Sequence, residues 1–215
     1  MARFIVLEGG EASGKSTQAA RLAQAIQAVL TREPGGTPLG ERVRSLLLDP
    51  TGPGISARAE ALLMMAARAQ HVQDVIAPAL AAGRDVVCDR FSASTIAYQG
   101  YGRGLDPEQL SQISHWASGG IMPDRVILLV VPRSEARARL TDRRADRIES
   151  EEETFFERVE AGFVALAGLD PIRWRIVDAT GDPDEVERRV RVAAMGQPQA
   201  TDSRRPGAPE RIPLR

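Results

Sequence analysis

The sequence lacks asparagine entirely and has a single lysine, Lys15, so the other 27 of its 28 basic residues are arginine. A GTPase switch reads its base with an Asn-Lys-x-Asp motif, which a chain without asparagine cannot form. The lone lysine lies instead in a glycine-rich segment near the N-terminus, described below. A switch-type GTPase or ATPase is therefore the weakest of the readings for this chain.

Cysteine is also scarce, since Cys88 is the only one and no internal disulfide can form. Cys88 lies in an apolar run, where we expect a small core residue on a strand and no nucleophile. No apolar run is long enough to span a bilayer, and the N-terminus has no signal-peptide layout, so we expect a cytoplasmic protein with no membrane partner. The formal net charge of −1 gives no basic field for nucleic acid.

Residues 9–16 read Gly-Gly-Glu-Ala-Ser-Gly-Lys-Ser and match the phosphate-loop pattern G-x-x-x-x-G-K-[ST]. An apolar run precedes them and a helix-period segment follows, which is the strand and helix context that the motif needs. The glycines let backbone N–H groups surround an anion, and a helix N-terminus adds unpaired donors. The pattern predicts that Lys15 reaches the β- and γ-phosphates of a nucleoside triphosphate and that Ser16 holds Mg²⁺. The alternative is a glycine-rich turn with no ligand.

Apolar strands alternate with longer helical segments along the chain, which is typical of a parallel α/β sheet with right-handed crossovers. The candidate strands are residues 3–7, 28–31, 85–88, 125–131 and 172–177. We expect a single domain over residues 1–195 and a flexible tail over 196–215, because the tail has several prolines and few apolar residues.

Helices are expected from about Gly14, over 58–82 with a possible break near Pro78, after Asp106, over 134–144 and 152–166, and from Asp182 to about Met195. His71 and His115 have no recognisable partner and are read as non-catalytic, and Trp116 and Trp174 as packing residues.

Four further stretches narrow the reading: Thr-Arg-Glu-Pro-Gly-Gly-Thr at 31–37, Ala-Ala-Arg-Ala-Gln-His at 66–71, Asp-Arg-Phe-Ser-Ala-Ser-Thr-Ile-Ala-Tyr-Gln-Gly at 89–100 and Arg-Arg-Ala-Asp-Arg-Ile-Glu at 143–149. The carboxyl ends of strands in a doubly wound sheet face the ligand crevice, which places Glu33, Asp89 and Arg90 beside the phosphate loop. Each stretch also has a plain structural reading: an ordinary turn at 32–35, a solvated Arg68, an Asp89–Arg90 ion pair, and water-facing arginines at 143–147.

Together these stretches resemble thymidylate kinase, over residues 4 to about 190. The resemblance implies a P-loop nucleoside-monophosphate-kinase-like fold, with a five-stranded parallel sheet covered by helices on both faces. It implies transfer of the γ-phosphoryl of ATP to dTMP with Mg²⁺, in a homodimer. The alternatives are a kinase of another nucleoside monophosphate or of a deoxynucleoside, and a catalytically dead nucleotide-binding module.

The resemblance also implies roles for individual residues, with a lid at about 141–152 that carries the catalytic arginines because Glu11 is in the loop. The residues expected at ATP are Gly9, Gly10, Glu11, Ala12, Ser13, Gly14, Lys15, Ser16 and Thr17. Those expected at dTMP are Glu33, Pro34, Met64, Arg68, Arg90, Ser94, Thr95, Tyr98 and Gln99. Catalysis is expected from Lys15, Arg90, Arg143, Arg144 and Arg147, and metal binding from Ser16 and Asp89.

Finer expectations follow from the same resemblance. Arg90 clamps the dTMP phosphate and Arg68 bonds a thymine carbonyl. Thr95 and Gln99 read the edge of the base, and Tyr98 favours deoxyribose.

Three features depart from the family pattern. The segment between Lys15 and Thr31 is several residues shorter than usual and has no glycine or proline to turn the chain, so we expect a shortened first helix and a short second strand. Met64 stands where an aromatic usually stacks on thymine, which loosens base discrimination because methionine is flexible. Val130 stands where the family often has aspartate.

Overall fold

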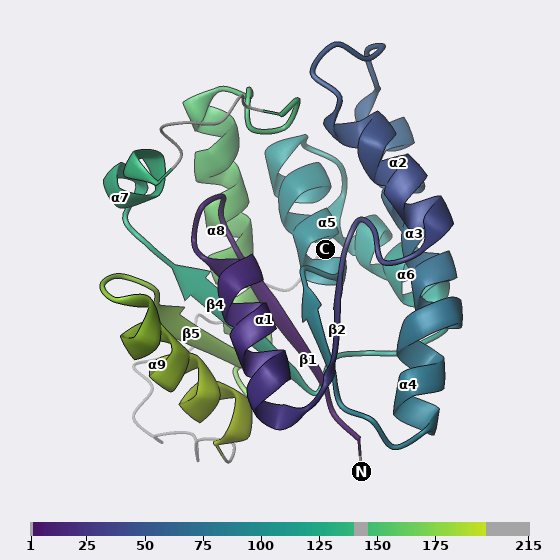
Figure 1. Cartoon of the computed structure of the whole chain (residues 1–215). Helices are drawn as coiled ribbons and strands as arrows, with labels where there is room; N and C mark the ends of the chain where they lie inside the picture. The colour runs from purple at the N-terminus through teal and green to yellow at the C-terminus, as the bar shows by residue number, and fades with distance from the viewer. Residues whose placement is uncertain (1, 140–145, 197–215) are drawn as a thin grey trace, which may run out of the picture.

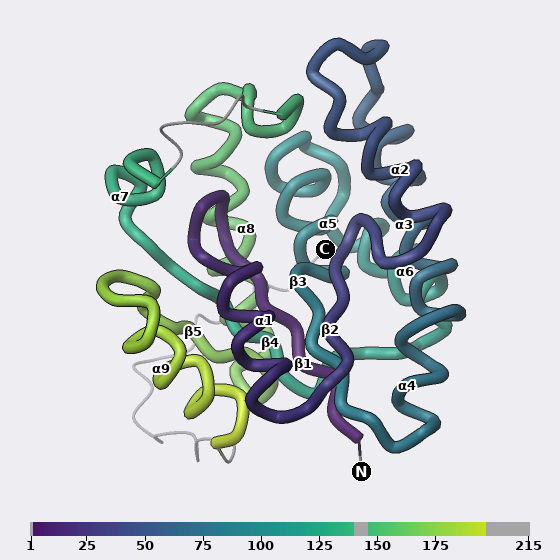
Figure 2. The backbone as a smooth tube through the Cα atoms, in the orientation of Figure 1, coloured from purple at the N-terminus to yellow at the C-terminus, as the bar shows by residue number. Residues whose placement is uncertain are grey.

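A five-stranded, entirely parallel sheet organises the chain, as expected (Figure 1). This computed structural model describes residues 2–139 and 146–196. The strand order is β2-β3-β1-β4-β5, so β1 is the central strand of the sheet. Figure 2 shows the path of the backbone through these strands. The strands are β1 (Phe4–Gly9), β2 (Val29–Arg32), β3 (Val86–Asp89), β4 (Arg125–Val130) and β5 (Trp174–Asp178). All five lie within two residues of the predicted ranges.

Helices cover both faces of this sheet. They are α1 (Lys15–Ile26), α2 (Pro38–Leu48), α3 (Ala57–His71), the π-helical η1 (Val72–Ile76), α4 (Ala77–Ala81), α5 (Ser92–Thr95), the π-helical η2 (Ile96–Gly102), α6 (Pro107–Ala117), α7 (Arg133–Ala138), α8 (Glu153–Leu169) and α9 (Pro183–Met195). None of the helices in the described part of the chain combines the length and the apolar character needed to cross a membrane.

The period-2 pattern of the central strand decides which helices lie on each face. Ile5 and Leu7 are fully buried in a cluster with residues of α1 and α9. Phe4 and Val6 point to the opposite face and pack with residues of η1, α4 and β3. Leu128 of β4 packs on that second face against α8 and η2. Glu8 continues the alternation of Phe4 and Val6, so its side chain faces α5 and the residue before it, Phe91.

The crossover from β1 to β2 turns without a glycine or a proline between Lys15 and Thr31. Helix α1 has 12 residues and β2 has four. The chain reverses at Gln27, which adopts a left-handed conformation with φ 55° and donates its backbone N–H to carbonyls of the last turn of α1. A non-glycine residue thus takes the position that glycine usually fills at a helix end.

Several helical details differ from the expectations. Helix α2, which the sequence analysis did not predict, begins at Pro38 behind a Thr37 cap and packs against α3 through Val43 and Leu47. Residues 57–81 are continuously helical, and a π-helical segment precedes Pro78 where a break was expected. Trp116 is 81% exposed, so the expectation that it packs in the core is wrong. Helix α7 ends at Ala138, and residues 140–144 of the expected helix at 134–144 lie outside the described ranges.

Candidate active site

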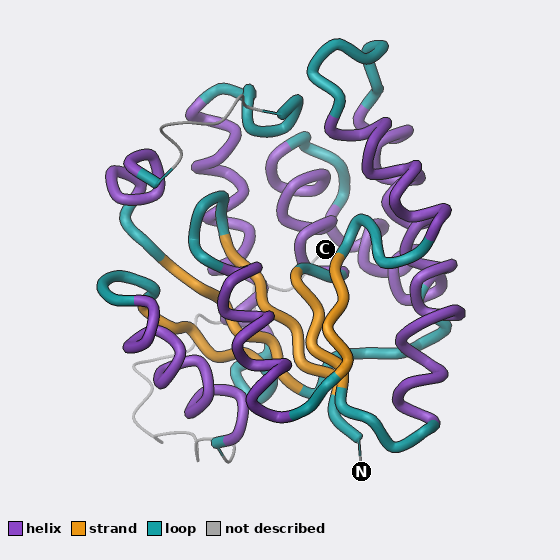
Figure 3. The backbone as a smooth tube through the Cα atoms, in the orientation of Figure 1, coloured by secondary structure: helices purple, strands orange, loops and turns teal. Residues whose placement is uncertain are grey.

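The glycine-rich loop joins β1 to α1 at the carboxyl end of the sheet, where Figure 3 shows loops following several strands. Gly9 has φ 145°, and a Cβ atom there would lie 2.4 Å from the carbonyl oxygen of Leu129 in β4. Gly14 has φ 86° and directly precedes the first residue of α1. Both positions therefore require glycine, and the helix N-terminus points its free amides into the loop.

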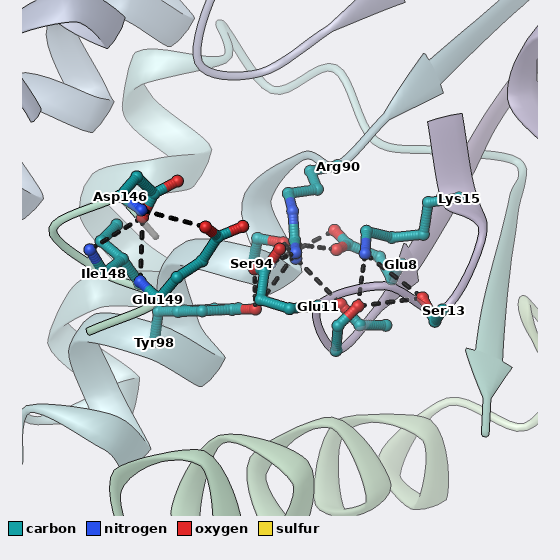
Figure 4. A network of polar contacts seen from close by, with 12 residues as sticks. Glu8, Glu11, Ser13, Lys15, Arg90, Ser94, Tyr98, Asp146, Ile148 and Glu149 are labelled. Atoms are coloured by element: carbon teal, nitrogen blue, oxygen red, sulfur yellow. Dashed lines mark hydrogen bonds and ion pairs between the residues drawn. The ribbon is translucent and has the colours of Figure 1, made fainter. Parts of the chain in front are cut away.

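Lys15 is buried, with only 6% of its surface exposed, and it folds back onto its own loop. Its Nζ donates hydrogen bonds to the Gly10 carbonyl oxygen at 2.5 Å and to Ser13 Oγ at 3.2 Å (Figure 4). Burial and the nearby Arg90 charge lower the pKa of the ammonium to about 8. The group thus stays mostly charged at neutral pH and sits where an anion in the loop can engage it.

The two residues predicted at the metal lie together, Ser16 in the first turn of α1 and Asp89 at the end of β3. The Ser16 hydroxyl donates a hydrogen bond to Asp89 Oδ2 at 2.5 Å. Asp89 Oδ1 is buried and has no hydrogen-bond partner in the described structure. No cluster of three or more His, Cys, Asp or Glu that could hold a metal was found among the described residues. A hydroxyl and one carboxylate suit Mg²⁺, which prefers oxygen ligands and keeps several waters and phosphate oxygens.

Arg90 connects the phosphate loop to the neighbouring cavity. It has φ 69°, and its guanidinium donates to the Gly9 carbonyl oxygen at 2.9 Å and to Glu11 Oε1 at 2.6 Å. The same group donates to Ser94 Oγ at 3.0 Å and to the Tyr98 hydroxyl at 3.1 Å, with its carbon 5.0 Å from the Tyr98 ring centroid. Arg90 is thus a preorganised cation held from three segments. Among the described residues its ion pair is with Glu11, so the interpretation as an Asp89–Arg90 ion pair is wrong.

Glu8 holds the residues that follow this arginine in place through hydrogen bonds to Phe91 and Ser94. The sequence analysis did not identify Glu8. Its Oε1 accepts hydrogen bonds from the backbone N–H groups of Phe91 and Ser94 at 2.9 and 3.2 Å, and its Oε2 accepts one from the Ser94 hydroxyl at 2.6 Å. Complete burial raises the pKa of the carboxyl to about 7. The only sequence signal was an acidic residue directly after the apolar run that forms β1.

A cavity opens beside Arg90, between α2, α3 and η2, with about 600 Å³ of empty space when the open solvent at its mouth is included. All nine residues predicted at the acceptor nucleotide line it: Glu33, Pro34, Met64, Arg68, Arg90, Ser94, Thr95, Tyr98 and Gln99. Its lining also includes Arg44, Leu48, Phe91, Asp146 and Ile148, which the sequence analysis did not predict. Arg44 lies on α2 and donates to the Pro34 carbonyl oxygen at 3.2 Å. The sequence analysis missed Arg44 because it did not predict α2, the helix that places this side chain at the cavity.

Arg68 lies in the wall of this cavity and is only 2% exposed, so the solvated reading of this residue is wrong. Its guanidinium donates to Glu33 Oε2 at 2.8 Å, to Thr95 Oγ1 at 2.9 Å and to Ser114 Oγ at 2.9 Å. Glu33 Oε1 also lies 3.0 Å from His71 Nδ1. His71 is fully buried and bonds Thr31 as well, so the expectation that it has no partner is also wrong.

A second, more polar hollow lies over the phosphate loop, with about 970 Å³ of empty space when open solvent is included. It is lined by Lys15, Ser16, Thr17 and Asp89, together with Arg139, which the sequence analysis missed. Arg139 donates to the Ala12 carbonyl oxygen at 3.2 Å from the end of α7. The residues shared by both hollows are Glu11, Glu33, Arg44, Arg90 and Asp146. The hollow over the glycine-rich loop and the base-sized cavity therefore meet at two arginines, Arg44 and Arg90.

Comparisons with known proteins agree with this geometry. The family model described as thymidylate kinase matches residues 7–190. The chain is 48% identical over 185 residues to the thymidylate kinase of Pelotomaculum thermopropionicum, covering 83% of this chain and 86% of that protein. It is 49% identical over 209 residues to the thymidylate kinase of Synechococcus sp. strain JA-2-3B'a(2-13), covering 94% and 100%. The chain belongs to the thymidylate kinase family.

A solved structure supports the same relationship. The crystal structure of thymidylate kinase from Ehrlichia chaffeensis superposes with a TM-score of 0.73 at 33% identity, covering 88% of this chain and 96% of that one. The sheet and its helices are thus those of the thymidylate kinase family, and the predicted fold class is confirmed.

The thymidylate kinase pattern of lid arginines is only partly visible here. Arg143 and Arg144 lie outside the described residues. Arg147 donates to the Leu47 carbonyl oxygen at 2.7 Å and to Glu60 Oε2 at 2.5 Å, and it lines neither of the two hollows above. Asp146 instead lines both and caps the following turn through the N–H groups of Ile148 and Glu149 (Figure 4).

Proposed function

We propose that this chain transfers the terminal phosphoryl group of ATP to dTMP, giving ADP and dTDP and thereby feeding dTTP synthesis. The observation that carries the proposal is the pair of hollows that share Arg90 and Arg44, one at a phosphate loop and one sized for a nucleotide base and sugar. Membership of the thymidylate kinase family names the nucleotides that suit these two hollows.

The reaction needs charge placement more than acid–base chemistry. The attacking phosphate oxygen of dTMP is already anionic, so catalysis consists of bringing two polyanions into line and stabilising charge on the transferred group. Lys15 at the loop and Arg90 at the junction are the preorganised cations for this task. The arginines at 143 and 144 are proposed to complete the ring from the lid.

Mg²⁺ is proposed to bind at Ser16 and Asp89, where the buried Asp89 Oδ1 offers an unused acceptor lone pair in the described structure. When bound there, the ion would neutralise charge on the phosphates of ATP. Ser16 in the first turn of α1 and Asp89 at the end of β3 would hold their oxygens side by side, so that the ion and the loop amides face the same phosphates.

The acceptor base is proposed to lie in the cavity between Met64, Arg68, Thr95 and Gln99, with Tyr98 beside the sugar. Met64 lies on α3 in the lining, in keeping with a thioether that covers one face of the base. Arg68 already donates to three neighbours, so it enters base recognition as a fixed group whose orientation does not depend on the ligand.

We further propose a homodimer in the cytoplasm. Trp116 of α6 and Leu62 of α3 are 81% and 60% exposed, and large exposed apolar side chains on neighbouring helices suit a subunit interface. The single cysteine is free and buried, which fits a reducing compartment. Light scattering would test the first statement, since a monomer at micromolar concentration contradicts it.

An ADP-release assay tests the function directly. Purified protein with ATP and Mg²⁺ is offered dTMP, dUMP, CMP, AMP and GMP, with EDTA in a parallel series. We expect dTMP to be the best acceptor and ADP release to depend on both dTMP and Mg²⁺. No conversion of dTMP to dTDP would refute the proposal, and a clear preference for another acceptor would reassign the substrate.

A further inference from the structure

The side-chain amide of Gln99 has a fixed orientation. Gln99 lies on η2, is 1% exposed and lines the base-sized cavity. Its Nε2 donates a hydrogen bond to Glu60 Oε1 at 2.7 Å. A carboxylate can only accept hydrogen bonds, so the amide nitrogen must face Glu60 and the amide oxygen must face away from it. The reversed amide would place two acceptors against each other.

Glu60 is held as a carboxylate from several sides. It is fully buried on α3, and its oxygens accept hydrogen bonds from Arg103 at 3.2 and 3.3 Å and from Arg147 at 2.5 Å. Burial alone disfavours its charge, but the hydrogen bonds from Arg147, Gln99 and Arg103 keep the pKa of the carboxyl below its ordinary value. Glu60 therefore cannot act as a donor to Gln99 near neutral pH.

The oxygen of the same amide is an acceptor that a bound ligand can use. Gln99 Oε1 is buried and has no hydrogen-bond partner in the part of the chain that the structure describes. A buried acceptor without a partner costs free energy that a bound donor recovers. Thymine carries a hydrogen on N3 and so offers such a donor, whereas N3 of cytosine is itself an acceptor.

We propose that Glu60 is a positioning residue that sets the hydrogen-bond polarity of Gln99 and thereby makes the cavity select a pyrimidine with an N3–H over cytosine. The inference rests on the proposed function, because it assigns the pyrimidine of the acceptor nucleotide to this cavity. Glu60 does not line the cavity and acts only through Gln99.

The test compares dTMP with dCMP as acceptors. In the Glu60→Gln variant, the new amide can donate to Gln99 Oε1, so that the Gln99 amide can turn and present its nitrogen to the base. We expect the ratio of kcat/KM for dTMP to that for dCMP to fall by at least about tenfold, the size of one mismatched buried hydrogen bond. An unchanged ratio in a folded variant overturns the inference.

A double variant and a control separate polarity from stability. Glu60→Gln combined with Gln99→Glu keeps the charge and returns an acceptor to the cavity, so the ratio is expected to recover. Arg103→Met removes another partner of Glu60 but leaves its bond to Gln99, and we expect the ratio to stay within about twofold of wild type, since that hydrogen bond is kept. Failure of the folded double variant to recover, or an equal loss in Arg103→Met, would show that Glu60 acts only structurally.

Two further measurements complete the design. Wild-type turnover of dTMP is measured first, because its absence refutes the proposed function, whereas normal turnover with an unaltered Glu60→Gln ratio refutes only this inference. If Glu60→Gln does not fold, wild-type protein is titrated with dTMP and with N3-methyl-dTMP. At least about tenfold weaker binding of the methylated nucleotide supports an acceptor at N3, and equal binding overturns it.

Discussion

The Ser94 hydroxyl donates to the buried Glu8 at 2.6 Å while accepting a hydrogen bond from Arg90 at 3.0 Å. Glu8 at the end of the central strand is thus joined to the cation at the meeting point of the two hollows. Since Glu8 also accepts the N–H groups of Phe91 and Ser94, it fixes the turn that gives Arg90 its left-handed backbone.

Replacement of Glu8 by glutamine should change how stability depends on pH. The folded pKa of about 7 lies above the ordinary value of 4.5, so the wild-type carboxyl stabilises the fold below pH 4.5 and this contribution is lost as pH rises through 7. We expect Glu8→Gln to gain stability relative to wild type between about pH 5 and 8, by on the order of 3 kcal/mol. Urea unfolding at several pH values measures this. Glu157→Gln, on the exposed face of α8, is the control. If the free energies of unfolding of Glu8→Gln and wild type differ by the same amount at every pH, the raised pKa of Glu8 is contradicted.

Replacement of Lys15 by methionine should leave the fold intact and lower turnover by at least about 10²-fold, because one preorganised donor to the phosphates is lost. ADP release under saturating ATP and dTMP measures turnover, and circular dichroism checks the fold. Arg84→Met, at an exposed turn before β3, serves as the matched loss of a positive charge. Near-normal phosphoryl transfer in Lys15→Met would refute the role of the loop.

The hydroxyl of Ser16 should be needed for metal dependence. Ser16→Ala is expected to raise the Mg²⁺ concentration for half-maximal activity by about tenfold or more, because one oxygen ligand is removed. Ser16→Thr keeps the hydroxyl and should stay close to wild type. A Mg²⁺ titration of ADP release distinguishes the two, and equal curves for alanine and threonine would exclude Ser16 as a ligand.

A more rigid side chain at position 64 should tighten acceptor binding. Met64 lines the base-sized cavity, and an aromatic ring there stacks on a base with less loss of side-chain freedom. We expect Met64→Phe to lower the Kd for dTMP by roughly threefold to tenfold in titration calorimetry, the gain typical of one aromatic pair. Val192→Phe, on the exposed side of α9, controls for the added ring. Unchanged or weaker affinity would place Met64 away from the base.

The sequence predicted the framework well because its signals were local. The five strands and the phosphate loop follow from apolar runs and glycine spacing, and the stretches at 31–37 and 89–100 lie at the strand ends that form the cavity. Glu8, Arg44 and Arg139 escaped prediction for different reasons. The role of Glu8 depends on amides contributed by the loop after β3, Arg44 lies on an unpredicted helix, and Arg139 follows a helix expected to continue.

Burial of polar side chains was the hardest property to foresee. His71 and Arg68 occur in a helix whose sequence does not show which face is covered, and only the packed structure brings Glu33 between them. Glu60 gave no signal for the same reason, because its partners Gln99, Arg103 and Arg147 come from other segments. The prediction for Trp116 was wrong in the opposite sense. This large apolar side chain was expected to pack, but it is exposed to solvent in the single chain.

The position of Lys15 gives the protein a built-in chemical label. Apart from the N-terminal amine, it is the only primary amine in the molecule, and its pKa of about 8 supplies free base in mildly alkaline solution. An acylating reagent that reaches a side-chain nitrogen must therefore enter the glycine-rich loop. The number of labels per protein molecule therefore reports how many molecules have a reactive Lys15. A nucleoside triphosphate bound at the loop is expected to compete with the reagent for the Lys15 Nζ atom.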